Sequence, residues 1–242
     1  MHHYCHEHPE TLSLETEVVD ARPGRVALAQ SPFYPGGGGQ LADRGIVRGK
    51  VGEARVVGFE YSAGKLWHLL DAQTEVTGGV EALVDADFRR RMRQLHTDTH
   101  ILNALVFRAF DGALVTGVQM ADDGSARMDF DVPGADNDRL RALEGPINDV
   151  IRQDIPVRFA YVPLHEAQAE RGLIRSRSVA PPADARWQDP DCRDRGPGPA
   201  SLWWNAPRVD RRLATHPHSQ SRQQGPPQPA RTDRLGRIVL TL

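Results

Sequence analysis

The division of this chain into strands and helices is decided by one stretch, Phe88-Arg89-Arg90-Arg91-Met92-Arg93-Gln94-Leu95-His96-Thr97-Asp98-Thr99-His100-Ile101-Leu102. Its large apolar residues, continued by Val106 and Ala109, recur at spacings of three, four or seven, which predicts a helix with one buried face. Asp85 or Asp87 is expected to cap its start, and Gly112 lies just past its end. The hydrophobic pattern changes here from that of strands to that of helices.

The residues before this helix, from Thr11 to about Asp85, have the alternating pattern of β-strands. Strands are predicted near 12–16, from residue 26, over 45–61 with a break near Gly52, and over 65–70. Several short strands separated by turn residues at this spacing predict a small barrel.

The residues after the helix mix both patterns. Strands are predicted over 113–120, 126–132 and 156–162, and helices over about 136–153 and around 164–171. A barrel followed by this series indicates an α+β protein. We expect three parts: a β-barrel domain with a glycine-rich loop over 1–86, a second domain over 87–182, and an irregular, disordered tail over 183–242.

The composition excludes two classes of protein. With 242 residues, 39% hydrophobic and 26% charged, the chain is too apolar for a disordered protein and too polar for a membrane protein. No apolar run approaches the roughly 20 residues that span a bilayer, and the start of the chain has no apolar signal-peptide core. Only two cysteines are present, so no disulfide framework is expected. We expect a cytoplasmic protein without a membrane partner.

The composition is nevertheless uneven along the chain. Ten of the 18 prolines lie beyond residue 180, where ten arginines face six aspartates and no glutamate occurs. Neither helical nor strand periodicity persists there, which is typical of a disordered basic tail.

His96 and His100 are spaced i and i+4, which places two imidazoles on one side of a helix, close enough to hold one ion. The same spacing supplies two ligands in zinc sites. The alternative is that both histidines edge the core and are hydrogen-bonded to neighbours. The pair alone is too small a ligand set, because a catalytic zinc has about three protein ligands.

A glycine-rich loop, Phe33-Tyr34-Pro35-Gly36-Gly37-Gly38-Gly39-Gln40, is the second unusual feature. Consecutive glycines allow a sharp turn or a close approach to the main chain, and exposed amides there can receive a phosphate or a carbonyl or carboxyl oxygen. The alternative is a flexible hairpin loop. Gln40, which can donate and accept hydrogen bonds, favours recognition.

Together these motifs resemble one family. The glycine loop with Gln40-Leu41-Ala42-Asp43-Arg44-Gly45, the histidine helix from Arg93 to Leu102, and Thr116-Gly117-Val118-Gln119-Met120 strongly resemble the stand-alone alanyl-tRNA editing proteins of the AlaX type. Those proteins are similar to the editing domain of alanyl-tRNA synthetase, and the resemblance covers about residues 11–182. It implies that residues 87–182 form the core of an editing domain of the threonyl/alanyl-tRNA synthetase type.

The resemblance also implies an activity and a site. The reaction would be hydrolysis of the ester that joins a wrong amino acid, serine or glycine, to the acceptor end of tRNA(Ala). Zn²⁺ would be held by His96, His100 and a downstream cysteine and histidine. Gln40 is the candidate catalytic residue. The candidate substrate-binding residues are Gly36, Gly37, Gly38, Gly39, Gln40 and Thr97. Sequence alone assigns no oligomeric state.

One part of the family pattern is missing. The family's downstream Cys-Gly-Gly-Thr-His, which supplies the other half of the zinc site, does not occur, and Cys192 has no histidine four residues on. The genetic code suggests a reason: read from the second base of each codon, Leu202-Trp203-Trp204-Asn205-Ala206 permits Cys-Gly-Gly-Thr-His, because both tryptophan codons then give glycine. In the same frame, 194–201 permits Ile-Glu-Gly-Leu-Asp-Arg-Gln-Ala and 222–230 permits Asp-Asn-Lys-Gly-Arg-His-Asn-Arg-Arg.

We therefore hypothesise a frameshift between about residues 183 and 186, with a divergent tail as the alternative. The coding DNA distinguishes the two. On the frameshift hypothesis, a zinc-dependent aminoacyl-tRNA hydrolase has lost half of its metal ligands in this chain. A non-catalytic tRNA- or synthetase-binding protein on the same fold is the second hypothesis, and a metal hydrolase of another small ester is the third.

Three charged or polar groups have open interpretations. The run Arg89-Arg90-Arg91 with Arg93 is either a tRNA-binding patch or a solvated helix start. Asp98 is expected to be a solvated charge on the helix. The histidines near the start of the chain, His2, His3, His6 and His8, are expected to lie in a disordered terminus.

Overall fold

The computed structural model describes residues 4–50, 52–73, 76–132, 134, 137–153, 155, 161–162, 174–177, 200–201 and 236–241. The chain forms two compact units, Met1–Arg93 and Gln94–Leu242. The predicted helix around 164–171, most of the predicted strand over 156–162, and most of the predicted tail over 183–242 lie outside the described residues.

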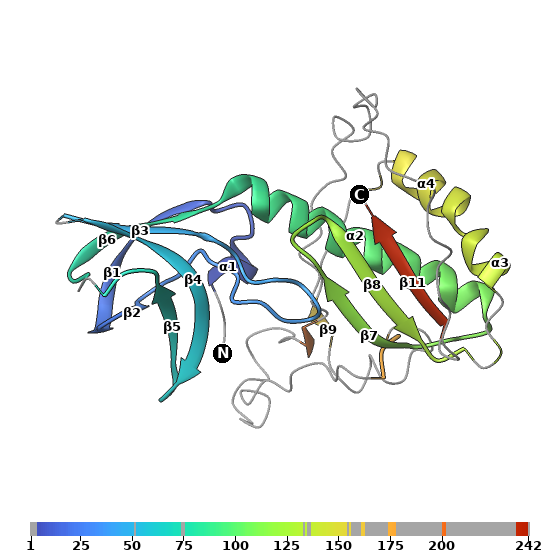
Figure 1. Ribbon diagram of the computed structural model, residues 1–242, viewed down its shortest axis with the longest axis horizontal. Helices are drawn as coiled ribbons and strands as arrows, with labels where there is room; N and C mark the ends of the chain where they lie inside the picture. The colour runs from blue at the N-terminus through green and yellow to red at the C-terminus, as the bar shows by residue number, and fades with distance from the viewer. Residues whose placement is uncertain are drawn as a thin grey trace, which may run out of the picture. The chain divides into compact units, whose positions relative to one another are not determined.

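The first unit contains a closed barrel of six antiparallel strands in the order β1-β2-β5-β4-β3-β6 (Figure 1). The strands are β1 (Ser13–Arg22), β2 (Arg25–Leu28), β3 (Gly45–Gly49), β4 (Glu53–Ser62), β5 (Lys65–Leu70) and β6 (Gly79–Val84), and a short helix, α1 (Tyr4–Glu7), precedes them. The predicted barrel is confirmed, and so is the break near Gly52, where the amide of Gly49 donates to the Gly52 carbonyl over 2.8 Å.

The barrel interior is filled by the inward members of the alternating pattern, and Phe33, Val47 and Ala82 are fully buried there. Two valines depart from this pattern. Val19 on β1 and Val57 on β4 are more than half exposed, and each lies where the strand register shifts by one residue. A bulge sends the extra side chain outward, so these exposed valines follow from strand geometry.

Helix α2 (Ala86–Ala109) begins and ends as the sequence predicts. Asp85 is the cap, because its Oδ1 accepts the amide of Phe88 over 3.0 Å. The helix stops where Asp111 and Gly112 have positive φ, and the Gly112 amide returns to the Phe107 carbonyl over 2.8 Å. The boundary between the compact units falls inside this helix, after Arg93, whereas the predicted domain boundary lies at its start.

The second unit has a three-stranded antiparallel sheet in the order β11-β8-β7, formed by β7 (Val115–Met120), β8 (Ser125–Phe130) and β11 (Gly236–Thr241). Its core joins side chains of β7 and β8 to those of α2, α3 (Asn137–Arg141) and α4 (Glu144–Arg152). Leu102, Val106, Met128, Phe130 and Ile147 are members of this cluster.

Two features of this unit differ from the sequence predictions. The single helix expected over 136–153 is two helices, because Pro146 has no amide to donate and its ring would clash with the carbonyl of Ala142 in a continuous helix. A proline is accommodated in the first turn of α4 instead. Within the segment expected to be an irregular tail, β11 pairs with β8 over six residues, and β10 (Ala200–Ser201) pairs with β9 (Tyr161–Val162).

Among the described residues, no helix combines the length and the apolar character needed to cross a bilayer.

The burial of His68, on β5, leads us to expect that the stability of the barrel depends on pH. Its side chain is fully buried, its Nδ1 donates to the Val26 carbonyl over 3.2 Å, and its Nε2 accepts from the Ser31 hydroxyl over 2.7 Å. Burial lowers the pKa of His68 to about 4. Because protonation favours the unfolded chain, this stability is present above pH 6.5 and is lost as the pH falls to 4.

We expect His68→Gln to remove about 3 kcal/mol of the loss in unfolding free energy between pH 7 and pH 4, since each pKa unit is worth about 1.4 kcal/mol. Urea unfolding followed by circular dichroism at the two pH values measures this. The exposed His8→Gln is the matched control. An equal pH dependence in wild type and His68→Gln would contradict the assignment.

Candidate functional site: a glycine loop and a histidine pair

The glycine-rich loop follows β2 and lies in the first unit. All four glycines have positive φ, at 92°, 126°, 57° and 84° from Gly36 to Gly39, a region that side-chain-bearing residues rarely adopt. Gly37 and Gln40 form a bridge in which each amide donates to the other's carbonyl, over 3.2 and 3.0 Å. The loop therefore makes a defined tight turn that requires glycine.

Tyr34 and Asp43 close the base of this loop. The Tyr34 amide donates to Oδ2 of Asp43 over 2.6 Å, and the Asp43 amide donates to the Tyr34 carbonyl over 2.9 Å. The Tyr34 hydroxyl donates to the Gly37 carbonyl over 2.9 Å. Gln40 is only 7% exposed. These contacts disfavour the flexible-hairpin alternative.

The internal bonds also limit which amides can receive a ligand. The amides of Gly37 and Gln40 are used inside the loop. The candidate donors to a ligand therefore narrow from the whole loop to the amides of Gly36, Gly38 and Gly39, together with the Gln40 side chain.

The arginines at the start of α2 correct the sequence interpretation. Arg89 is 3% exposed and lies on Asp43, with its Nε 2.9 and 2.8 Å from the two carboxylate oxygens. Its guanidinium also donates to the carbonyls of Pro9 and Pro32 over 3.1 and 2.7 Å. Arg93 is buried as well and pairs with Glu10 over 2.7 Å.

Arg89 and Arg93 therefore form neither part of a solvated helix start nor part of a tRNA patch. Arg90 and Arg91 are exposed, and Arg90 pairs with Asp87 over 2.7 Å.

The expected disordered terminus is wrong for residues 4–10. The Cys5 side chain is 1% exposed, and burial raises the pKa of its thiol to about 12. The His6 ring lies 5.9 Å from the Tyr34 ring. With the Arg89 and Arg93 contacts to Pro9 and Glu10, this segment packs beside the loop base. His2 and His3 lie outside the described residues.

The histidine pair lies on α2 within the second unit. The rings of His96 and His100 are 4.8 Å apart between centroids and nearly parallel, at 16°. Burial lowers the pKa of His96 to about 4, and burial with the positive charges of His96 and Arg175 lowers the pKa of His100 to about 3. Both imidazoles are therefore neutral near pH 7, which is the form that binds a metal.

The three residues between the histidines are all buried. Thr99 donates its hydroxyl to the His96 carbonyl over 2.7 Å. Asp98 is not the expected solvated charge: it is 6% exposed, and burial raises its carboxyl pKa to about 7. Thr97 is 5% exposed.

The described residues supply two candidate metal ligands, His96 and His100, and contain no group of three or more histidine, cysteine or acidic side chains that could hold an ion. The paired neutral imidazoles fit half of a tetrahedral zinc site. Cys192 and the segments 194–201, 202–206 and 222–230 lie outside the described part of the chain.

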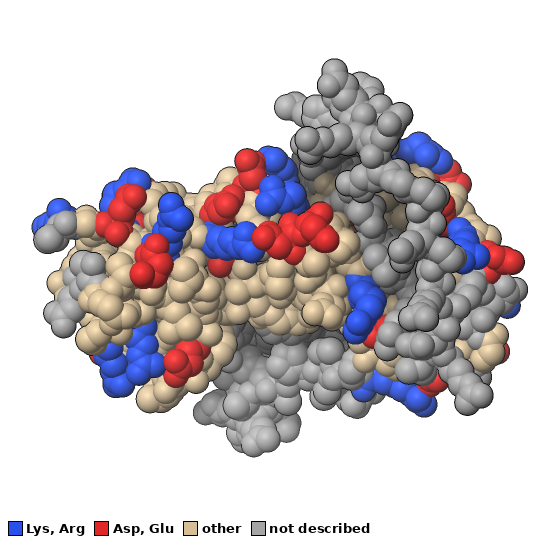
Figure 2. Space-filling model, viewed as in Figure 1, with Lys and Arg blue, Asp and Glu red and all other residues tan. Residues whose placement is uncertain are grey.

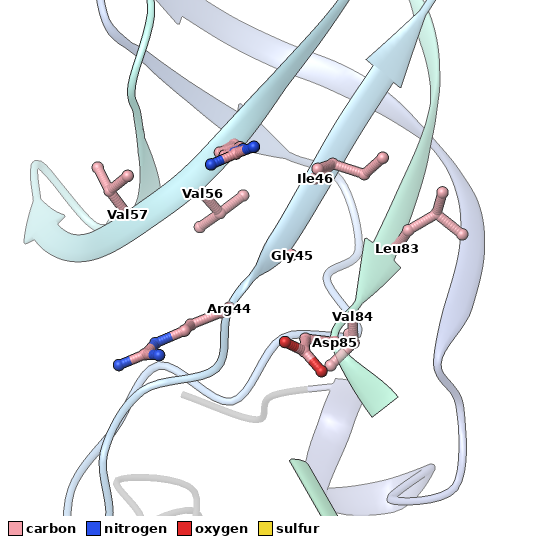
Figure 3. A pocket seen from close by; sticks show the side chains of 9 residues that line it. Arg44, Gly45, Ile46, Val56, Val57, Leu83, Val84 and Asp85 are labelled. Atoms are coloured by element: carbon pink, nitrogen blue, oxygen red, sulfur yellow. The ribbon is translucent and has the colours of Figure 1, made fainter. Parts of the chain in front are cut away.

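A pocket that the sequence did not indicate lies on the barrel, with a volume of about 610 Å³. Arg44 and Asp85 lie at one end of it, and Ile46, Val56 and Val57 lie at the other (Figure 3). Strands β3 and β6 approach each other closely here: a Cβ on Gly45 would fall 1.9 Å from the Leu83 carbonyl oxygen, so only glycine fits. The lining holds one carboxylate and no nucleophile, so we assign no chemistry to it.

The surface of the barrel unit mixes both charges. On the face shown in Figure 2, Lys and Arg side chains alternate with Asp and Glu. Several form pairs, including Arg25 with Glu60 over 3.0 Å and Lys65 with Asp20 over 2.7 Å. Neighbouring carboxylates therefore offset part of the basic charge that would attract phosphate.

Comparison with known proteins gives the family. The chain is 33% identical, over 72% of its length, to the alanyl-tRNA editing protein AlaX-M of Saccharolobus solfataricus, and covers 74% of that protein. The chain belongs to the family of alanyl-tRNA editing proteins.

Larger proteins contain a related region. The alanine–tRNA ligase of Pyrobaculum neutrophilum is 30% identical over 71% of this chain, and that of Methanopyrus kandleri is 34% identical over 61%. The chain covers only 20% and 16% of these ligases. No protein-family model matches the chain. The alanyl-tRNA editing family is thus the one that the sequence motifs indicated.

For this editing-family chain, the loop geometry predicts the effect of Tyr34→Phe. The substitution removes the hydroxyl that donates to Gly37, and a hydrogen bond of this kind contributes about 1 kcal/mol. We expect urea unfolding to show a loss of that size. Tyr4→Phe, on a tyrosine whose ring lies beside that of His8, is the control. Equal losses in the two variants would show that the hydroxyl does not brace the loop.

Proposed function

We propose that this protein's family function is to hydrolyse the ester that joins a wrong amino acid, serine or glycine, to the acceptor end of tRNA(Ala). The observation that carries the proposal is the 33% identity to a protein named for alanyl-tRNA editing, over 72% of the chain. The chemical need is general. A pocket built for alanine cannot strongly reject an analogue that adds a hydroxyl or lacks a methyl group, so a second site removes the error.

The glycine loop is our candidate for holding the aminoacyl end. The tight turn fixes the positions of the loop amides before a ligand binds. Hydrogen-bond donors that are already in place suit a carbonyl oxygen that gains negative charge in the reaction. We assign Gln40 and the amides of Gly36, Gly38 and Gly39 to this role. Thr97 remains our candidate for a hydroxyl beside the metal.

We propose Zn²⁺ as the cofactor of the intact family site, with His96 and His100 as two of its ligands. Their parallel neutral rings on one turn of α2 support this. A bound zinc ion would supply polarisation of the ester carbonyl or activation of a water molecule. The remaining ligands would come from the downstream segment that the frameshift hypothesis restores, and we propose that this chain lacks full activity without them.

A non-catalytic tRNA- or synthetase-binding protein is the second candidate. The observation that favours it is that the family's downstream Cys-Gly-Gly-Thr-His does not occur in this sequence. Such a protein would bind tRNA(Ala) without turnover.

Deacylation assays separate these candidates. We expect the chain as it stands to contain far less than one zinc per chain by elemental analysis and to leave seryl-tRNA(Ala) intact. A chain translated from a frame-corrected gene is expected to hydrolyse seryl-tRNA(Ala) and to spare alanyl-tRNA(Ala). Binding without turnover by both chains would favour the second candidate. Stoichiometric zinc and selective hydrolysis by the present chain would contradict its proposed loss of activity.

We expect His96→Ala, made in the frame-corrected protein, to reduce the zinc content from about one ion per chain to near zero and to abolish hydrolysis. Circular dichroism should show that the fold is kept, because alanine is a strong helix former and position 96 lies inside α2. His8→Ala, an exposed histidine, is the control. Unchanged zinc and activity would make the pair structural.

A further inference from the structure

The buried ion pair between Arg89 and Asp43 lies beside the loop to which the proposed function assigns the aminoacyl end. Both side chains are almost fully withdrawn from solvent, at 4% and 0% exposure. The carboxylate of Asp43 has two tasks. It accepts the Arg89 guanidinium, and it accepts the backbone amide of Tyr34 over 2.6 Å.

These bonds form a continuous path from helix α2 to the tip of the loop. The Arg89 guanidinium donates to the Asp43 carboxylate. That carboxylate accepts the Tyr34 amide, and the Asp43 amide donates to the Tyr34 carbonyl. The Tyr34 hydroxyl holds the Gly37 carbonyl, and Gly37 and Gln40 exchange two backbone bonds. The place of Gln40 is therefore linked to Arg89 by direct contacts alone.

The other contacts of Arg89 require the planar guanidinium group of an arginine. The same guanidinium reaches the Pro32 carbonyl, just before the loop, and the Pro9 carbonyl on the terminal segment. An ammonium group on a flexible stem could not satisfy three acceptors in this fixed arrangement. Arg93, one helical turn later, is also buried, and its guanidinium donates to the Pro9 carbonyl and to the Glu10 carboxylate on the terminal segment.

We propose that Arg89 and Asp43 are positioning residues, which hold the glycine loop and Gln40 in the conformation that binds an aminoacyl ester of adenosine. The identity of the ligand rests on the proposed function. The ordering of the loop rests only on the contacts described above. Glycine-rich segments have many alternative conformations, so a loop that is ordered only part of the time binds more weakly in proportion.

The test uses the full chain and a non-hydrolysable amide analogue of 3′-seryl-adenosine, because binding does not require turnover. Arg89→Lys is compared with Arg93→Lys, the matched control on the same helix. We expect Arg89→Lys to raise the Kd of the analogue about tenfold, as for a loop that is ordered a tenth of the time. We expect Arg93→Lys to change that Kd by less than about twofold. Urea unfolding of both variants shows whether any loss merely follows stability.

Two further measurements separate a positioning role from a general structural one. In Arg89→Lys, amide hydrogen exchange at Gly37 and Gln40 is expected to accelerate while the strands of the barrel keep their protection. In Arg89→Ala, added methylguanidinium is expected to restore slow exchange at these amides. If Arg89→Ala does not fold, the lysine variant still decides the question.

The outcomes are distinguishable. Unchanged loop exchange and unchanged affinity in Arg89→Lys would overturn the positioning role, as would equal losses of affinity in the two lysine variants. If wild type fails to bind the analogue while Arg89→Lys still accelerates loop exchange, the loop ordering is upheld and the proposed function of the loop fails.

Discussion

One buried ion pair, Arg89 with Asp43, connects the parts of the barrel unit that bear on function. Two opposite charges withdrawn from water are costly, and removing one partner of such a pair typically destabilises a protein by about 3–5 kcal/mol. Here the carboxylate and the guanidinium are fully used by each other, by the Tyr34 amide and by the carbonyls of Pro9 and Pro32. The pair thereby joins the start of α2, the base of the glycine loop and the terminal segment.

The histidine pair depends on a different constraint, the regular spacing of a helix. Because α2 is uninterrupted from Ala86 to Ala109, side chains four residues apart lie one above the other, and His96 and His100 stack. Burial keeps both rings neutral. The helix thus presents two imidazoles in the neutral form that the proposed zinc site needs, and on our proposal the remaining ligands depend on how the segment beyond about residue 183 is encoded.

Local patterns predicted much of this structure. Alternation predicted the barrel, the spacing of Met92, Leu95 and Leu102 predicted α2, and Asp85 and Gly112 marked its ends as proposed. The sequence left the order inside the glycine loop open, because glycines occur both in flexible loops and in tight turns with positive φ. The tie to Tyr34 and Asp43 decides between them.

Three wrong predictions, those for the arginine run, the terminal segment and β11, share one cause, which is a partner far away in the sequence. A run of arginines reads alike whether it is solvated or paired, and Asp43 lies 46 residues before Arg89. The order of the terminal segment could not be predicted locally, because its partners Arg89 and Arg93 lie 80 or more residues away in the sequence. Strand β11 has its partner β8 more than 100 residues earlier, beyond the reach of local pattern analysis. The break before α4, in contrast, had a local signal in Pro146.

The contacts of Tyr34, Asp43 and Arg89 hold the glycine loop in one conformation before any ligand binds. Native-state amide hydrogen exchange of the unliganded wild-type protein measures this directly at Gly37 and Gln40, whose amides are bonded across the turn. We expect both amides to exchange far more slowly than amides in an unfolded chain and to be as well protected as those of the neighbouring barrel strands. Exchange at the unfolded-chain rate, with the strands still protected, would contradict it.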